Sequence, residues 1–154
     1  MLALGAARLA RSCAVAGVDT GRRTAISTPV TRRILIVDDS EPNRRLPALI
    51  LKQLGWDTVE AETGEAALAA AREHEFECVL LDLLLPDLHG FQVCEALRRL
   101  PQGAQLRIIA YSALADGESM LDLTALGFDA ILGKPLNRQA LTRVLERTDG
   151  AAND

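Results

Sequence analysis

The chain has 154 residues, of which 49% are hydrophobic and 25% charged, a globular composition long enough for one domain with its own core. No apolar run approaches the roughly 18 uncharged residues that a membrane span needs, so a soluble protein without membrane contacts is expected. Residues 1–32 carry a net charge of +4 and residues 33–154 a net charge of −8, which argues against nucleic acid as a direct ligand of the acidic part.

Residues 1–31 contain no strand pattern and are rich in arginine and small residues. An Arg-rich leader poor in acids is compatible with an organelle transit peptide, in which residues 2–16 would form a short amphipathic helix. The alternative, a disordered extension or a start codon placed too early, is the expectation adopted here, because the Ala, Arg and Leu bias runs through the whole chain. No function is assigned to this segment.

From residue 34 onward, strand patterns alternate with helix patterns. Strands are predicted over residues 34–37, 58–61, 78–82, 107–111 and 130–133, the second of them polar enough for a sheet edge. Helices are predicted from Ser40 to Gly55 and over residues 64–73, 91–100, 118–126 and 137–147, the last of them capped by Asn137. Such alternation predicts a parallel sheet, because each right-handed crossover needs a helix to return the chain.

The first of these helices contains an anomaly. Its apolar residues Leu46, Leu49, Ile50 and Leu54 are expected to face the core. Pro47 falls inside the same helix, where it removes a backbone hydrogen bond and is expected to kink the helix or fray its start, at a cost of roughly 3 kcal/mol.

The third predicted strand belongs to an apolar run, residues 78–86, with one carboxylate in its middle. Pro86 and Gly90 end the strand soon after Asp82, so this carboxylate lies at the carboxyl end of a buried strand. A carboxylate among leucines is costly to desolvate, and it must be paired, hydrogen-bonded or bound to a cation. The three cysteines, Cys13, Cys78 and Cys94, are odd in number and form no C-x-x-C pair, which predicts buried reduced thiols in a cytoplasmic protein rather than disulfides or metal ligands.

Four of the five predicted strands end in polar residues, and all these ends lie on one edge of a parallel sheet. The residues are Asp38 and Asp39, Asp82, Ser112 and Lys134. Clustered carboxylates without a His or Cys ligand suit Mg²⁺, and a carboxylate beside that ion can act as a nucleophile toward a phosphoryl group. Asp82 is the candidate nucleophile, and the alternative is a buried salt bridge between Lys134 and Asp82 without such chemistry.

This set of residues closely resembles the receiver domain of two-component response regulators, over residues 33–148. The resemblance rests on Asp38-Asp39, Asp82 with Pro86 and Gly90 after it, Ser112-Ala113 and Lys134-Pro135. It implies a flavodoxin-like (βα)5 three-layer sandwich whose parallel sheet has the strand order 2-1-3-4-5. Residues 149–154 would then form a flexible tail.

The resemblance also implies a role for each site residue. Asp82 would accept a phosphoryl group from a phosphohistidine, Asp38 and Asp39 would hold Mg²⁺ together with Asp82, Ser112 would follow the phosphoryl group and Lys134 would pair with it. A cis peptide bond before Pro135 is also implied. Such a domain is not an enzyme.

The partners implied are a sensor histidine kinase or a histidine phosphotransfer protein as donor and an unidentified protein as output target. Output, and possible dimerisation, would use the face formed by the fourth helix, the fifth strand and the fifth helix. The chain is expected to be a stand-alone receiver, and the alternative is a fragment of a hybrid histidine kinase. A Mg²⁺-dependent phosphohydrolase of the haloacid dehalogenase type would need an Asp-x-Asp motif, which neither Asp38-Asp39-Ser40 nor Asp82-Leu83-Leu84 supplies.

The sequence departs from the receiver pattern at several positions. Ile131 stands where receivers usually carry the Tyr or Phe that moves with the hydroxyl, which leaves the usual aromatic switch in doubt. His89 stands where an acidic residue is frequent, and it is expected to be a solvated loop residue. Leu84 and Leu114 hold the positions that flank the phosphoryl group, and two apolar side chains there predict slow hydrolysis.

Overall fold

This computed structural model describes residues 32–113 and 122–151. Three predictions therefore fall outside the described part of the chain. They concern residues 1–31, the segment 114–121 with the start of the predicted fourth helix, and residues 152–154. None of the helices in that part combines the length and the apolar character needed to cross a membrane.

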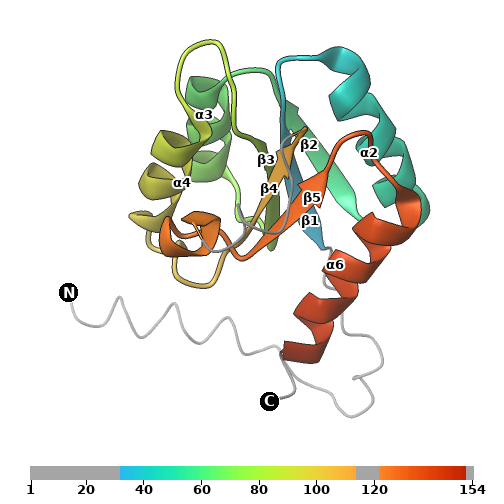
Figure 1. Ribbon diagram of the computed structural model, residues 1–154. Coiled ribbons are helices and arrows are strands. Elements are labelled where there is room, and N and C mark those ends of the chain that lie inside the picture. The colour runs from blue at the N-terminus through green and yellow to red at the C-terminus, as the bar shows by residue number, and fades with distance from the viewer. Residues whose placement is uncertain (1–31, 114–121, 152–154) are drawn as a thin grey trace, which may run out of the picture. The chain divides into compact units, whose positions relative to one another are not determined.

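The five strands form one parallel sheet in the order β2-β1-β3-β4-β5, which confirms the flavodoxin-like fold (Figure 1). The strands are β1 (Arg33–Val37), β2 (Asp57–Ala61), β3 (Cys78–Asp82), β4 (Arg107–Ser112) and β5 (Ala130–Gly133). The helices are α2 (Glu41–Gln53), α3 (Gly64–Glu73), α4 (Gly90–Arg98) and α6 (Arg138–Ala151). The last of these extends four residues beyond its predicted end at residue 147.

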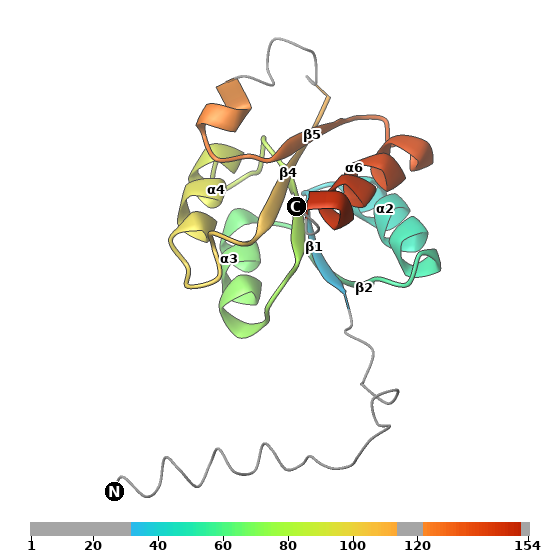
Figure 2. The ribbon, with the colours of Figure 1, turned by 90° about the horizontal axis from the view of Figure 1, so that it is seen from below.

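Successive side chains of the central strands alternate between two cores, one on each face of the sheet. Leu35 and Leu81 pack with residues of α3 and α4, whereas Ile36 and Leu80 pack with residues of α2 and α6. Figures 1 and 2 show the two pairs of helices on opposite faces of the sheet. The strands β1, β3 and β4 are buried on both faces, which is why they read as continuous apolar runs.

The prediction for the buried face of the first helix was wrong. Leu46, Leu49 and Leu54 are exposed, by 47%, 53% and 39%, and of the predicted set only Ile50 packs against the core. The buried stripe consists instead of Arg44, Pro47, Ala48 and Leu51, at helical spacing. The hydropathy pattern did not predict this stripe, because the stripe contains an arginine and only one large apolar residue. The helix is continuous through Pro47, which packs on its buried face.

One guanidinium joins three segments on the α4 side of the sheet. Arg98, the last residue of α4, donates hydrogen bonds to the backbone carbonyls of Gly103 and Leu106, each at 2.6 Å. It also donates to the carbonyl of Gly127 and, at 2.8 Å, to the carboxylate of Asp129. The end of α4, the loop that follows it and the entry to β5 are therefore held by a single side chain.

Candidate functional site

The two acids that end β1 occupy different environments. Asp38 is fully buried, and its Oδ1 accepts a hydrogen bond from the backbone N–H of Ser40 at 2.9 Å. Asp39 is exposed. Arg44 of α2, itself buried, donates to the carbonyl oxygen of Asp38 at 2.8 Å and to the carboxylate of Glu60 at 3.2 Å. Sequence reasoning missed Arg44, because nothing local distinguishes it from the exposed Arg45 beside it.

Asp82 ends β3 and Lys134 directly follows β5, so both lie at the carboxyl edge of the parallel sheet. The Lys134 ammonium lies 2.7 Å from Oδ2 of Asp38 and 3.4 Å from Oδ1 of Asp82. The peptide bond between Lys134 and Pro135 is cis, as the resemblance implied. The lysine therefore contacts two of the acids. The sequence alternative was a salt bridge to Asp82, but the closer partner is Asp38.

The three carboxylates that the sequence predicts as cation ligands lie close together. Asp38, Asp39 and Asp82 each offer an oxygen, and these oxygens lie within 4.8 Å of one another. Oδ2 of Asp38 is buried and accepts no hydrogen bond of good geometry, although Lys134 Nζ is close to it. An all-oxygen donor set, with one buried oxygen held only by an ion pair, fits a hard divalent cation such as Mg²⁺.

The electrostatics of Asp82 reflect this crowding. Burial raises the pKa of Asp82 above its ordinary value, the neighbouring Asp38 carboxylate raises it further, and the Lys134 ammonium opposes both effects. The folded protein therefore tolerates the ionised form of Asp82 less well than water does. A cation in the cluster would relieve that penalty.

Ser112, the last residue of β4, is buried and lies on the strand between β3 and β5. It pairs in register with Gly133, and its carbonyl accepts a hydrogen bond from the backbone N–H of Lys134 at 3.0 Å. All five predicted site residues thus belong to the carboxyl ends of neighbouring strands. Leu84, which is 63% exposed, lies two residues beyond Asp82, and its counterpart Leu114 is outside the described residues.

The loop after Asp82 is fixed to a helix that the sequence did not connect with it. The Asp87 carboxylate accepts hydrogen bonds from the backbone N–H groups of Gly64 and Glu65, at 2.8 and 2.9 Å, at the start of α3. These bonds lower the pKa of Asp87. Gly90 closes the loop by donating to the carbonyl of Leu83 at 2.8 Å, and a Cβ on Gly90 would lie 2.6 Å from Leu83 Cα. Glycine is therefore required there.

His89 is exposed, as expected, but it also takes part in hydrogen bonds at the start of α4. Its Nδ1 accepts a hydrogen bond from the backbone N–H of Phe91 at 3.3 Å, and the Gln92 side chain accepts one from the His89 backbone at 2.9 Å. Together they form a reciprocal cap at the start of α4. The His89 ring nitrogen thus serves as a capping acceptor for α4.

An aromatic ring does lie beside the site, but on the other face of the sheet from the expected position. Ile131 packs in the α3–α4 core, whereas Tyr111 belongs to the α2–α6 core and is 1% exposed. The Lys134 ammonium lies 4.9 Å from the centroid of the Tyr111 ring. Tyr111 is the only tyrosine of the chain and immediately precedes Ser112. That adjacency is the sequence feature from which a ring beside the site could have been predicted.

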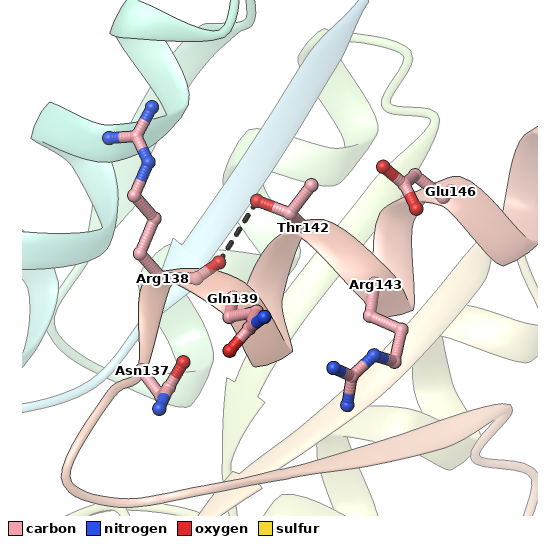
Figure 3. A pocket seen from close by; sticks show the side chains of 6 residues that line it. All are labelled: Asn137, Arg138, Gln139, Thr142, Arg143 and Glu146. Carbon is pink, nitrogen blue, oxygen red and sulfur yellow. Dashed lines mark hydrogen bonds between the residues drawn. The ribbon is translucent and has the colours of Figure 1, made fainter.

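A concave surface occurs along the first turns of α6. It is lined by Asn137, Arg138, Gln139, Thr142, Arg143 and Glu146. Figure 3 shows these side chains projecting in different directions from successive turns of the same helix. They do not converge on a point as the carboxylates do, and the strand ends remain the candidate site.

Comparison with known proteins identifies the family of the domain. Residues 34–146 match the family model of the response regulator receiver domain. A probable transcriptional regulator, ycf27 of Porphyridium aerugineum, is 32% identical over 126 residues, which are 79% of this chain and 51% of that protein. The chain spans between 6% and 51% of the length of the first curated relatives that it matches.

Solved structures match the domain almost end to end. The chemotaxis protein CheY4 of Vibrio cholerae has a TM-score of 0.73 at 28% identity, covering 77% of this chain and 99% of that one. The receiver domain of the sensor histidine kinase PA1611 from Pseudomonas aeruginosa PAO1, solved with magnesium coordinated in its active-site cleft, has a TM-score of 0.71 at 28% identity and covers 79% and 99%. From residue 34 to residue 146, this chain belongs to the response regulator receiver family.

Proposed function

We propose that this receiver accepts a phosphoryl group on Asp82 from a phosphohistidine of a sensor histidine kinase or a histidine phosphotransfer protein. The observation that carries the proposal is the position of Asp82 at the end of the central strand β3, among two other carboxylates and 3.4 Å from the Lys134 ammonium. Signalling domains of this kind are phosphoacceptors rather than classical enzymes. That is consistent with a site that offers one nucleophile and charge neutralisation.

The chemistry would proceed by direct displacement. An oxygen of the Asp82 carboxylate attacks the phosphorus, the phosphorus–nitrogen bond to the imidazole breaks with its electron pair leaving on nitrogen, and an acyl phosphate forms. Lys134 would neutralise an oxygen of the transferred group, and Ser112 would follow it. The protein thus contributes position and charge more than covalent chemistry.

Asp38, Asp39 and Asp82 would hold Mg²⁺. When bound, the cation supplies positive charge to the phosphoryl oxygens. The chain's own contribution is to keep Asp38 buried and fixed, through the hydrogen bonds from Ser40 and Arg44, so that its carboxylate faces the cluster. Asp39, which is exposed, would complete the set from the solvent side.

The downstream partner would be a protein that contacts the face formed by the helix ending at residue 126, β5 and α6. Dimerisation would use the same face. Residues 114–121 lie outside the described residues, and this face is proposed from the family resemblance.

The proposal is tested with a small phosphodonor. The protein is incubated with acetyl phosphate and Mg²⁺, and its intact mass is measured. One phosphate should be added to the wild type and to Asp87→Asn, a matched control in the loop next to the site, but none to Asp82→Asn. Equal labelling of Asp82→Asn, or no labelling of the wild type under conditions that label other receivers, would refute the assignment.

The lifetime of the acyl phosphate is a separate prediction. Leu84 offers no amide or carboxylate that could orient an attacking water, and the same holds for Leu114 by sequence. We expect Leu84→Asn to lose label from Asp82 faster than the wild type does. Equal decay rates would mean that the lifetime is controlled elsewhere.

A further inference from the structure

The ring of Tyr111 and the ammonium of Lys134 are held together by the sheet itself. Tyr111 lies in β4 and pairs in register with Leu132 of β5, two residues before Lys134. The backbone N–H of Lys134 donates to the carbonyl of Ser112 at 3.0 Å. Ring and lysine are therefore fixed to neighbouring strands, with Nζ over the ring at 4.9 Å from its centroid.

The ammonium has three N–H donors, and its side chain is only 16% exposed. Asp38 Oδ2, at 2.7 Å, and Asp82 Oδ1, at 3.4 Å, are its two carboxylate partners. The face of an aromatic ring carries partial negative charge and attracts a cation within about 6 Å of its centroid. The Tyr111 ring thus supplies a third partner where water has little access.

We propose that Tyr111 is a positioning residue for Lys134. The Tyr111 ring holds the Lys134 ammonium beside Asp82, where the oxygens of the phosphoryl group would lie. A lysine side chain is long and loses much rotamer freedom when it is held in one place, so a preformed third contact favours the productive position. The consequence for rate rests on the proposed function of Asp82. The consequence for the position of Lys134 does not.

The ring, rather than the hydroxyl, carries this role. Burial, followed by the charges of Asp38 and Asp82, raises the pKa of Tyr111 to about 12, so the phenol is neutral at physiological pH. Phenylalanine should therefore replace it without a change of charge or loss of the ring face. Leucine keeps an apolar side chain in the same core but removes the ring. Phe128→Leu, which removes a buried ring from the opposite core, is the matched control.

The first measurement needs neither metal nor phosphate. The chain has only two lysines, Lys134 and the exposed Lys52 in α2, so the ε-methylene signals of the two are resolved by lysine-selective NMR labelling. The ring current of Tyr111 should shift the Lys134 protons upfield of those of Lys52. The shift should persist in Tyr111→Phe and in Phe128→Leu, and it should be lost in Tyr111→Leu.

The second measurement is the rate of Asp82 phosphorylation by acetyl phosphate at saturating Mg²⁺. We expect Tyr111→Leu to be slower than wild type by roughly 3- to 30-fold, the range spanned by cation–π contacts, while Tyr111→Phe and Phe128→Leu stay near the wild-type rate. Urea unfolding of each variant checks that the protein is folded during the assay.

Three results would overturn the inference. These are a Lys134 signal in Tyr111→Leu that matches the wild type, a wild-type rate in Tyr111→Leu, or equal slowing in Tyr111→Leu and Phe128→Leu. If the wild type accepts no phosphate at all, the proposed function fails, and the NMR comparison alone decides whether Tyr111 positions the lysine.

Discussion

Replacing Asp38 or Asp39 by asparagine should separate the contributions of two adjacent acids. Asp38 is fully buried and 2.7 Å from Lys134, whereas Asp39 is exposed. Removing one partner of a buried ion pair costs about 3–5 kcal/mol, because the remaining charge stays buried. Lys134 keeps Asp82 at 3.4 Å, and the repulsion between Asp38 and Asp82 disappears, so the cost is reduced. We expect Asp38→Asn to lower the free energy of unfolding by about 2 kcal/mol.

Asp39→Asn should change the free energy of unfolding by less than about 0.5 kcal/mol, or raise it, because it removes an exposed negative charge from an acidic cluster. Both variants should bind Mg²⁺ more weakly, since each loses a carboxylate ligand. The assay is urea unfolding in EDTA, followed by the fluorescence of Trp56, the only tryptophan, which is buried in the α2–α6 core. Mg²⁺ titration of the folded variants gives the second quantity.

The reasoning would be refuted if Asp39→Asn destabilised the metal-free protein as much as Asp38→Asn does. It would also be refuted if Asp38→Asn stabilised the metal-free protein, because repulsion among the acids would then outweigh the pairing of Asp38 with Lys134. A change in stability confined to Mg²⁺-containing buffer would show that the two acids act only through the cation.

Three further predictions concern stability. Leu51→Ala in α2 should lower the free energy of unfolding by about 2–5 kcal/mol, while Leu49→Ala, at an exposed position of the same helix, should change it by less than about 0.5 kcal/mol in urea unfolding. Arg98→Ala should cost about 2–4 kcal/mol because several backbone carbonyls lose a charged donor, whereas Arg99→Ala, which breaks only an exposed ion pair with a Glu one turn away, should cost about 0.5 kcal/mol or less. Because the pKa of Asp82 is raised in the folded protein, its protonation stabilises the fold. This contribution to the free energy of unfolding is fully present below the ordinary pKa of 3.8 and is lost as pH rises through the raised pKa. Metal-free Asp82→Asn should therefore be more stable than wild type at neutral pH, with the difference vanishing below pH 4; a constant difference across this range would contradict the assignment.

The strand ends were accessible from sequence because they depend on local signals. Buried parallel strands read as apolar runs, and the topology of alternating strands and helices sends all their carboxyl ends to one edge. That places Asp38, Asp39, Asp82, Ser112 and Lys134 together without any knowledge of side-chain conformation.

What could not be predicted depends on contacts between segments distant in the chain. The buried face of α2 includes Arg44, whose partners are Asp38, just after β1, and Glu60, in β2. Hydropathy alone predicts that this arginine is exposed. The ring of Tyr111 is paired with Lys134 only through the register of β4 and β5. Asp87 reaches α3 across more than 20 residues of sequence.

The hydrogen bonds of residues 83–90 limit which part of the site can move when Asp82 is modified. The segment is closed by the Gly90–Leu83 hydrogen bond and tied to the start of α3 by Asp87, so its backbone has little room to shift. Added bulk and charge on Asp82 would have to be accommodated on the opposite side, where Lys134 and the end of β4 face it. The two sides of Asp82 are therefore held by different kinds of contact, backbone hydrogen bonds of the loop toward α3 and the charged side chain of Lys134 toward β5.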